Sequence, residues 1–546
     1  MRILCLRSGH DASATILNDG NIEYYFKEER YSRIKKDESI KNLIKILVDN
    51  YNLIGDIDYF NFSINEHIEN MCHQDLEILR SLLYGSKQIT YNAYQHHLYH
   101  ASNAFYNSGF EKAIVFVADA SGAPISINDE ETFESESVYI AEYPCKFKPI
   151  LKNYWTGLRL KNKKERKLIG DCTYNISSIT NYITIGNLYN SAALASGGSV
   201  NDCGKAMGLS SYGESIDKSF DLLGIKGREL IMDYFSEESK FVDYLEFRTE
   251  RLDTPNITES NYKKISDYCY EVQIQTTDYV CKIIGDAIKK TNIKKVCLSG
   301  GYAMNIVTNY ELVKRYPDVE FYFEPLCDDS GLAVGSSMYF YRRISKDKTI
   351  LKIKDTFNHG FNHDLSKYNS DQVANSKDIS RLLFENKSVG IYGGISESGQ
   401  RALGNRSILF NALNPNAKDI VNAIKKREWY RPFAAIVLKE DASKYFDDIF
   451  DNEFMTVCFP VKTNLIPGVT HVDKTCRVQT VSGGHLYDIL QEFKKLSGHG
   501  ILLNTSLNLS GEPLVESPDQ AFDTLRNSTL DYLWFYQTKQ LFKSPI

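Results

Sequence analysis

The stretch KVCLSGGYAMN, residues 295–305, predicts a short buried strand, a glycine-rich turn and the start of a helix. Backbone N–H groups in such a turn can face a phosphate, because they lie at the N-terminus of the helix. A further strand is expected at Glu320–Phe323, followed by an acidic turn that contains Asp328 and Asp329. Strands that end on glycine-rich or acidic turns favour an α/β fold that binds ligands at its strand ends.

A similar series of strands and turns occurs nearer the N-terminus. We expect strands at Met1–Arg7 and Asn21–Phe26, with a hairpin signal at residues 18–20 before the latter. Another strand is expected at Lys112–Ala118, and it ends at Asp119. Two α/β halves of this kind predict an actin-like nucleotide-binding fold.

The composition is that of a soluble globular protein. Of the 546 residues, 42 % are apolar and 25 % are charged, and the net charge of −6 gives no overall attraction to phosphate polymers. No run reaches roughly 18 apolar residues, so we expect no membrane-spanning helix. The eleven cysteines form no CxxC pair and the N-terminus lacks a signal-peptide pattern, so we expect a cytoplasmic protein with reduced thiols.

The length predicts two to four domains, at roughly 100–200 residues per domain. We assign residues 1–350 to a metal- and nucleotide-binding domain and residues 380–546 to a separate α/β domain. The polar residues 351–379 are interpreted as the linker between them.

The helix expected at residues 96–106 carries His96 and His100 on one face, because helical residues four apart project in the same direction. Such a pair can share one metal ion. Asp119 ends the next expected strand, and Asp328-Asp329-Ser330-Gly331 ends a later one. Two imidazoles and two carboxylates suit Fe²⁺, Mn²⁺ or Zn²⁺ better than a thiolate-preferring ion. The alternatives are an exposed helix face for the histidines and a loop or helix cap for each aspartate.

Basic side chains in the C-terminal part stand within segments of small or apolar residues. Guanidinium groups suit di- and triphosphates, and serine and asparagine add neutral hydrogen bonds. An exposed basic face is the alternative, but it does not explain cations embedded in apolar segments. We therefore expect an anion site formed by Arg401, Arg406, Lys425, Arg427, Arg431, Arg477, Ser506 and Asn508.

Ten short motifs stand in order along the chain, at residues 9–13, 28–32, 96–101, 205–213, 299–305, 329–335, 400–409, 425–434, 471–481 and 502–515. In this order they resemble the NodU/CmcH family of O-carbamoyltransferases, and the resemblance covers nearly the whole chain. Three departures occur, and one is that the segment from Lys425 to Arg427 lies one residue closer to Arg401 than the family spacing predicts. The family usually has Asp-Gly where this chain has Asp119-Ala120, and Met-Glu-Phe-Gly-Pro-Arg where this chain has residues 395–401.

The resemblance implies an actin-like (ASKHA) N-terminal domain fused to a YrdC-like C-terminal domain. It implies a metal site, with Fe²⁺ as the expected ion and Mn²⁺ or Zn²⁺ as alternatives, at His96, His100, Asp119 and Asp329. It implies nucleotide contacts from Lys205, Gly300, Gly301 and Asn305. The YrdC-like signature maps to Lys425, Arg427, Ser506 and Asn508.

The implied reaction has two stages. ATP, with Mg²⁺, and carbamoyl phosphate would give carbamoyl-adenylate in the C-terminal domain, where the cations stabilise developing phosphate charge. The carbamoyl group would then pass to an acceptor hydroxyl, with His10 as the candidate base or, alternatively, as a structural histidine. Because carbamoyl-adenylate hydrolyses in water, we expect both sites to face one enclosed path.

The acceptor is not determined by the sequence. We expect a hydroxyl of a sugar, a natural product or a hydroxymethyl group. The alternatives are a hydroxymethyl nucleobase in DNA and threonylcarbamoyl-type tRNA modification, so a nucleic acid acceptor stays open. A nucleotide-sensing binding protein is another alternative, and the presence of both the metal set and the anion set argues against it. We expect no membrane partner, and a homodimer stays open.

Overall fold

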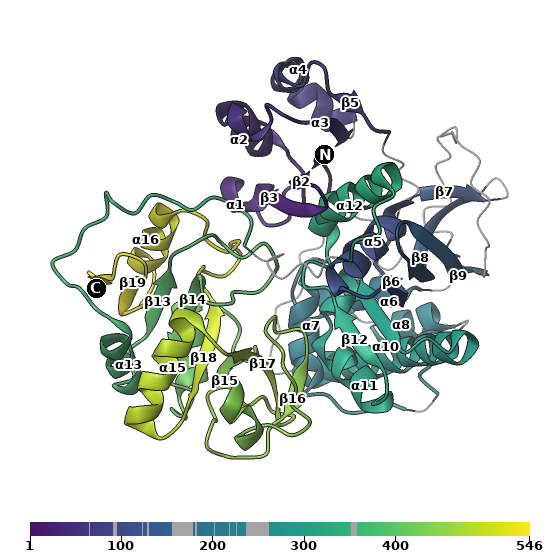
Figure 1. Ribbon diagram of the computed structural model, residues 1–546. Helices are drawn as coiled ribbons and strands as arrows, with labels where there is room; N and C mark the ends of the chain where they lie inside the picture. Colours follow the sequence, from purple (N-terminus) through teal and green to yellow (C-terminus); the bar gives the residue numbers. More distant parts are fainter. Residues whose placement is uncertain are drawn as a thin grey trace.

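Three β-sheets with helices packed on them organise the chain in this computed structural model (Figure 1). The structure describes residues 1–545 except 65, 91–94, 123, 128–129, 156–177, 181–182, 201, 218, 225, 236–260 and 351–357. The mixed α/β class predicted from the sequence is confirmed.

The first sheet has the strand order β3-β2-β1-β4-β5. Its first three strands are antiparallel, whereas β4 and β5 run parallel to β1. The apolar run Ile3–Leu6 is buried, which suits the central position of β1. The elements are β1 (Arg2–Arg7), β2 (Ser13–Asn18), β3 (Asn21–Lys27), α1 (Glu28–Ser32), α2 (Lys41–Asp49), β4 (Tyr59–Ser63), α3 (Glu66–Met71), α4 (His73–Leu82) and β5 (Lys87–Gln88).

The second sheet repeats this arrangement. In its order β10-β9-β8-β6-β11-β12, strands β6, β8 and β9 are antiparallel neighbours, and β11 and β12 run parallel to β6. The repetition is what the resemblance to actin-like domains implies. The strands are β6 (Lys112–Ala118), β7 (Pro124–Ile127), β8 (Glu130–Glu142), β9 (Lys146–Trp155), β10 (Ser178–Thr180), β11 (Lys295–Ser299) and β12 (Glu320–Phe323). The helices are α5 (His96–Ser108), α6 (Ile185–Ala195), α7 (Cys203–Ser210), α8 (Gly227–Tyr234), α10 (Tyr262–Thr291), α11 (Ile306–Arg315) and α12 (Leu332–Ser345).

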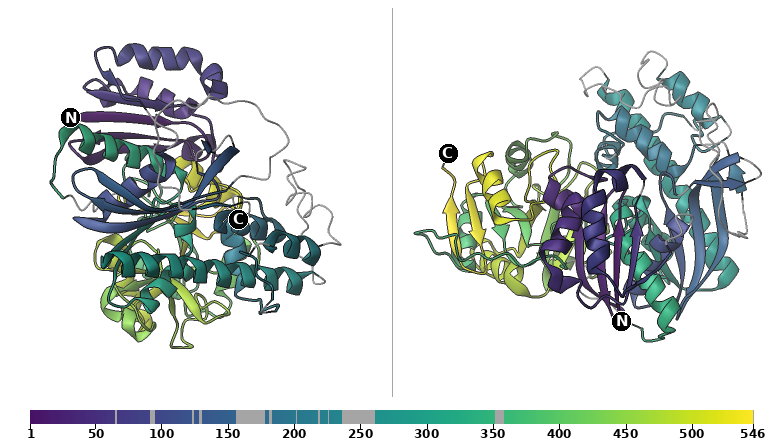
Figure 2. Two further views of the ribbon diagram at one scale, coloured as in Figure 1. Left: turned by 90° about the vertical axis from the view of Figure 1, so that its right-hand side faces the viewer. Right: turned by 90° about the horizontal axis from the view of Figure 1, so that it is seen from above.

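Helices α5 and α12 pack against each other between these two sheets (Figure 2). α12 contacts β1 and β2, whereas α5 contacts β6 and β11. A glycine permits the close approach, since a Cβ on Gly335 would lie 1.9 Å from the carbonyl oxygen of Tyr99. The start of α12 is thereby held beside the first turn of α5.

The third sheet forms the C-terminal domain, with the strand order β16-β17-β15-β18-β14-β13-β19-β20. It mixes parallel and antiparallel pairs, and α13 packs against α15 beside it. The elements are α13 (Ser376–Phe384), β13 (Val389–Tyr392), β14 (Arg406–Phe410), α14 (Ala417–Lys425), β15 (Ala434–Leu438), β16 (Cys458–Pro460), β17 (Thr475–Val481), α15 (Gly484–Ser497), β18 (Ile501–Ser506), α16 (Pro518–Arg526), β19 (Tyr532–Phe535) and β20 (Gln540–Lys543).

Residues 358–379 of the predicted linker contact both domains. The N–H group of Tyr25 in β3 donates to the carbonyl oxygen of His359 at 2.9 Å, and Phe361 packs against Phe26, whereas Tyr368 and Ser370 bond to the C-terminal domain. Val373 forms a β-bridge with Gln540, and a capping box at Asn375 starts α13 at Ser376, before the boundary predicted at residue 380. Residues 351–357 lie outside the described residues. Among the helices that the structure describes, none combines the length and apolar character needed to cross a lipid bilayer.

Hydrogen bonds join the two domains at several places, including one beside α1 and one at α11. Beside α1, the Arg33 guanidinium donates to the carbonyl oxygen of Leu514 at 2.8 Å. In α11, the Asn309 amide donates to the carbonyl oxygen of Thr456 at 2.9 Å, and one hydrophobic core continues from α11 into the segment before β16. The two domains are therefore packed together at both places.

Candidate metal centre and interdomain cavity

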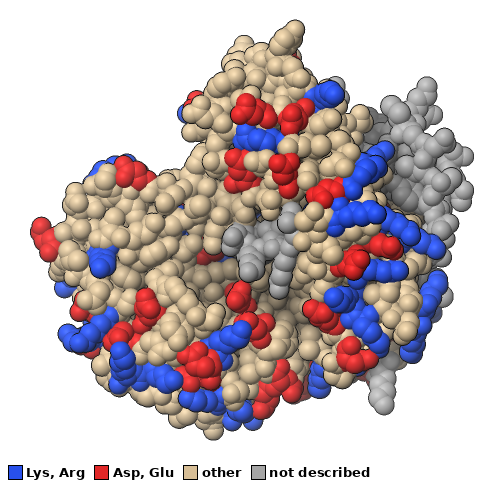
Figure 3. All heavy atoms as spheres, viewed as in Figure 1, with Lys and Arg blue, Asp and Glu red and all other residues tan. Residues whose placement is uncertain are grey.

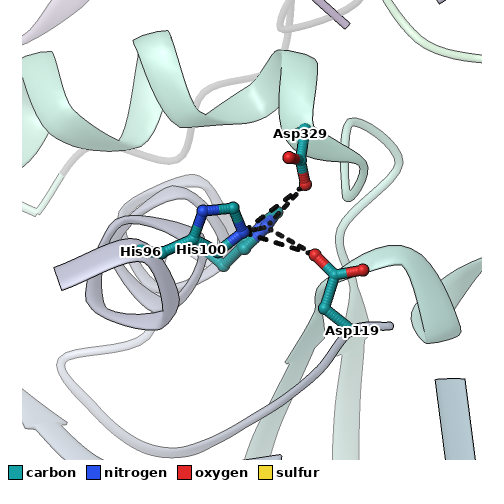
Figure 4. A group of neighbouring side chains, drawn as sticks. All are labelled: His96, His100, Asp119 and Asp329. Atoms are coloured by element: carbon teal, nitrogen blue, oxygen red, sulfur yellow. Dashed lines mark hydrogen bonds and ion pairs between the residues drawn. The ribbon is translucent and has the colours of Figure 1, made fainter. Parts of the chain in front are cut away.

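Four side chains from three elements converge on one point between α5 and α12 (Figure 4). His96 and His100 project from α5, and their Nε2 atoms lie 3.2 Å apart. Asp119 follows β6, and Asp329 lies in the single turn that precedes α12. Each carboxylate oxygen is 3.3–3.5 Å from the two ring nitrogens. The structure thus brings together all four residues predicted as metal ligands.

The chemistry of this group fits a divalent ion. One potential ligand atom from each residue lies within 4.8 Å of all the others, and both imidazoles are buried. Burial by itself lowers the pKa of His96, but the charge of Asp329 and the hydrogen bond of Asp119 raise it to about 9. Without a metal, a proton on His96 therefore offsets the negative charges of Asp119 and Asp329. Mixed nitrogen and oxygen ligands suit a first-row transition ion that would replace this proton.

A cavity of about 400 Å³ adjoins the metal centre and has walls from both domains. Asp119 and Asp329 reach it from the N-terminal domain, and Gln400, Arg401 and Arg431 reach it from the C-terminal domain. A cavity of this volume is within the usual size range of small-molecule sites. The remaining predicted residues that line it are His10, Lys205, Gly301 and Asn305.

The glycine turn after β11 forms part of the cavity wall. Gly300 has φ +84°, and a Cβ there would lie 2.3 Å from the carbonyl oxygen of Ala118, so β6 and β11 require glycine for their close approach. Gly300 itself does not line the cavity. Asn305 does, but its side chain caps α11 by accepting from the N–H groups of Val307 and Thr308.

His10 and Lys205 reach the cavity with their polar groups already paired. His10 Nδ1 lies 3.1 Å from Asp11 Oδ2, and Lys205 Nζ lies 2.8 Å from Glu428 Oε1. Burial lowers the pKa of His10, but the hydrogen bond and charge of Asp11 raise it to about 9. In the metal-free protein His10 therefore carries a proton at neutral pH.

The buried Lys425 and the half-buried Arg427 and Arg477 gather in the C-terminal domain, and Glu428 pairs with Arg431 nearby at 3.5 Å. Lys425 Nζ lies 2.5 Å from the carbonyl oxygen of Ser506 and 2.6 Å from Asn508 Oδ1. Burial and the nearby guanidinium of Arg427 hold the pKa of Lys425 well below its usual range. Burial and two nearby guanidinium groups act in the same way on the pKa of Arg477. A cluster of this kind has the electrostatics of an anion site.

Two family models match the chain. The one described as Carbamoyltransferase N-terminus matches residues 2–338, and the one described as Carbamoyltransferase C-terminus matches residues 380–540. The chain belongs to the carbamoyltransferase family. The predictions of the family and of a carbamoyltransferase enzyme are confirmed.

Relatives of this carbamoyltransferase include a nodulation protein and an O-carbamoyltransferase. Nodulation protein NolNO of Sinorhizobium fredii is 26 % identical, and the match covers 96 % of this chain and 78 % of NolNO. The 3'-hydroxymethylcephem-O-carbamoyltransferase of Streptomyces clavuligerus is 28 % identical, over 58 % of this chain and 60 % of that enzyme. The solved structure of HypF from T. kodakarensis is 10 % identical, covers 63 % of this chain and 48 % of its own, and has a TM-score of 0.38.

The contacts of Arg406 do not place it among the cations around Lys425 and Arg477. The residue is fully buried, and its guanidinium donates to the carbonyl oxygens of Gly393 at 2.6 Å and Glu516 at 3.2 Å. It also lies 3.9 Å from the ring centre of Tyr392. Through these contacts Arg406 links β14 to neighbouring loops. In the sequence, an arginine with this structural role looks the same as an anion ligand, because both stand among apolar residues.

Two supports of the metal centre were missed by the sequence analysis. The Arg7 guanidinium donates to the main-chain oxygen of Asp329 at 2.7 Å and to its Oδ2 at 3.1 Å. The buried carboxylate of Glu134, paired with Lys152, accepts from the backbone N–H of His97 at 3.2 Å and so caps α5. Neither residue belongs to a recognisable local motif, because each acts on a distant part of the chain.

Proposed function

We propose that this carbamoyltransferase forms carbamoyl-adenylate from carbamoyl phosphate and ATP and transfers the carbamoyl group to an acceptor hydroxyl. The observation that carries the proposal is the cavity of about 400 Å³, which adjoins Asp119 and Asp329 on one side and Arg401 and Arg431 on the other. A labile intermediate made beside the cations would reach the metal centre without crossing bulk water.

The first stage is assigned to the C-terminal cations. Water attacks the phosphorus of carbamoyl phosphate, the bond from phosphorus to the carbamoyl oxygen breaks, and phosphate and carbamate form. A carbamate oxygen then attacks the α-phosphorus of ATP while pyrophosphate leaves. We assign to Lys425, Arg427 and Arg477 the stabilisation of the charge that develops on the phosphate oxygens. Their depressed pKa values support this role, because buried cations with few counter-ions gain most when an anion binds.

The second stage is assigned to the N-terminal domain. An acceptor oxygen attacks the carbamoyl carbon, the bond to the adenylate phosphate breaks, and AMP leaves. A divalent ion held by His96, His100, Asp119 and Asp329 would supply polarisation of a carbonyl or phosphate oxygen. We propose Fe²⁺ for this site, with Mn²⁺ or Zn²⁺ as alternatives, and Mg²⁺ with ATP.

His10 is the candidate to take the proton of the acceptor hydroxyl. It lines the cavity next to Asp329, and Asp11 fixes its ring by contact with Nδ1. A protonated imidazole cannot accept that proton, so the role requires that positive charge at the metal centre favours the neutral ring. If His10 stays protonated, it would instead orient an oxygen of the substrate.

We propose a small-molecule or sugar hydroxyl as the acceptor. Figure 3 shows Lys and Arg interspersed with Asp and Glu over the viewed face, and the net charge is −6. Binding of a nucleic acid draws mainly on clustered cations, so this distribution favours a small acceptor over a DNA base or tRNA.

Exchange of labelled pyrophosphate into ATP tests the first stage. We expect exchange that depends on carbamoyl phosphate, and a gain of one carbamoyl group in acceptor pools followed by mass spectrometry. Exchange without carbamoyl phosphate, or none with it, would contradict the proposal. Carbamoylated DNA or tRNA in place of a small molecule would overturn the acceptor class alone.

A further inference from the structure

Lys27, the last residue of β3, lies among buried carboxylates. Its side chain is 2 % exposed. Three carboxylates surround its ammonium, those of Asp11, Asp328 and Glu29, at 3.0, 3.0 and 3.3 Å. Burial alone lowers the pKa of Lys27, but these carboxylates raise it well above its usual range, so the ammonium keeps its charge. One buried cation therefore holds three segments of the chain together.

Two of these carboxylates, Asp11 and Asp328, directly adjoin in sequence the residues His10 and Asp329 of the proposed transfer step. Asp11 contacts His10 Nδ1, and Asp328 directly precedes the metal-centre residue Asp329. Asp11 also has φ 62°, a left-handed conformation that is uncommon for a non-glycine residue, although aspartate adopts it more readily than most. The contact with Lys27 supports this conformation.

The same cluster reaches the C-terminal domain. The Gln400 amide donates to Asp328 Oδ2, the oxygen that Lys27 also contacts. The guanidinium of Arg30 donates to the carbonyl oxygens of residues 397 and 399, at 3.3 and 2.9 Å. The segment that carries Arg401 into the cavity is thus anchored on the turn that carries Asp329.

We propose that Lys27 is a positioning residue for carbamoyl transfer: its ammonium fixes Asp11 and Asp328, and through them the places of His10 and Asp329. The proposal rests on the proposed metal centre. Supporting contacts around ligands commonly change metal affinity by 10–100-fold when they are removed. Lys27 touches neither metal nor substrate in this role, so it acts through its two aspartates.

The test measures Co²⁺ binding to the full chain, with the visible absorption of bound Co²⁺ as a report on ligand geometry. Lys27→Met should weaken Co²⁺ binding about tenfold or more and change the absorption. A purely electrostatic role gives the opposite sign, because removal of a nearby positive charge strengthens cation binding. Lys27→Arg keeps the charge and should restore affinity at least in part.

Arg33→Met is the matched control. Arg33 also crosses to the C-terminal domain, at Leu514 and Pro513, but no described contact joins it to Asp11 or Asp328. Its Co²⁺ affinity should stay within about twofold of native. Pyrophosphate exchange in Lys27→Arg should stay within twofold of native, since the charge at this position and the C-terminal cations are unchanged.

Native or tighter Co²⁺ binding by Lys27→Met, with an unchanged spectrum, would overturn the proposal. If Lys27→Met does not fold, Gln400→Leu replaces it in the experiment. This variant removes a neutral donor to Asp328 Oδ2, the oxygen that Lys27 also contacts. It should weaken Co²⁺ binding in the same direction, and native affinity would overturn the proposal. If the native chain binds no Co²⁺, or His100→Ala binds it equally well, the proposed metal centre fails, and the role of Lys27 fails with it.

Discussion

Replacing Arg477 with methionine should make the protein more stable and nearly inactive in adenylate synthesis. Burial and the nearby Arg401 and Arg427 hold the pKa of Arg477 well below its usual range. Within the described part of the chain, no atom accepts a hydrogen bond from its buried Nε. A buried charge without a counter-ion destabilises the fold. Methionine fills much of the same space without that charge.

The two effects have opposite signs. The gain in stability should be about 1 kcal/mol, within the range seen when unfavourable charges are removed. For a domain of about 150–250 residues this raises the unfolding midpoint by about 2–4 °C. The rate should fall about 10²–10³-fold, as when one preorganised donor to a developing anion is lost.

Thermal unfolding without ligand measures the first effect, and carbamoyl-phosphate-dependent pyrophosphate exchange measures the second. Arg526→Met is the matched control, because Arg526 is 60 % exposed and pairs with Asp523 within α16. It should change neither quantity. An Arg477→Met protein that loses stability, or that keeps the native exchange rate, would refute the reasoning.

Three further predictions concern other parts of the molecule. His100→Ala should abolish tight Co²⁺ binding, measured by titration calorimetry, and leave pyrophosphate exchange within twofold; unchanged metal stoichiometry would contradict it. Gly300→Ala should cost about 1–3 kcal/mol in chemical unfolding, because its Cβ would meet the carbonyl of Ala118, whereas Gly204→Ala, whose Cβ meets no atom within 4 Å, should be nearly neutral. Burial raises the pKa of Glu516, but its hydrogen bonds lower it below 4.5. The stability that Glu516 contributes is therefore complete above pH 4.5 and lost as the pH falls below it, and Glu516→Gln should flatten that part of the stability profile.

The metal ligands could be predicted because local geometry fixes most of them. The spacing of His96 and His100 places both rings on one helix face, and Asp119 ends a strand that its apolar run makes recognisable. Asp329 required the family resemblance, since nothing local relates it to α5. The mixed α/β class could also be predicted, because its strands and turns give local patterns within a few residues.

The roles of charged residues within apolar segments could not be predicted. Arg406 and Arg477 give the same signal in the sequence, yet one donates to main-chain carbonyls and the other faces cations. Lys27 gives no signal, because Asp11 and Asp328 lie on turns that the sequence does not relate to it. What separates these cases is the set of neighbours, and only the tertiary structure supplies it.

Placing the metal centre between α5 and α12 also affects how the chain unfolds. An ion there would tie residue 96 to residue 329 and close a loop that contains the whole second sheet. Closing a long loop removes entropy from the unfolded chain, as a disulfide does, and binding of an ion stabilises only the state that has the site. The ion would then act as a removable cross-link, and loss of metal would expose the protein to heat and proteases as well as stop its chemistry.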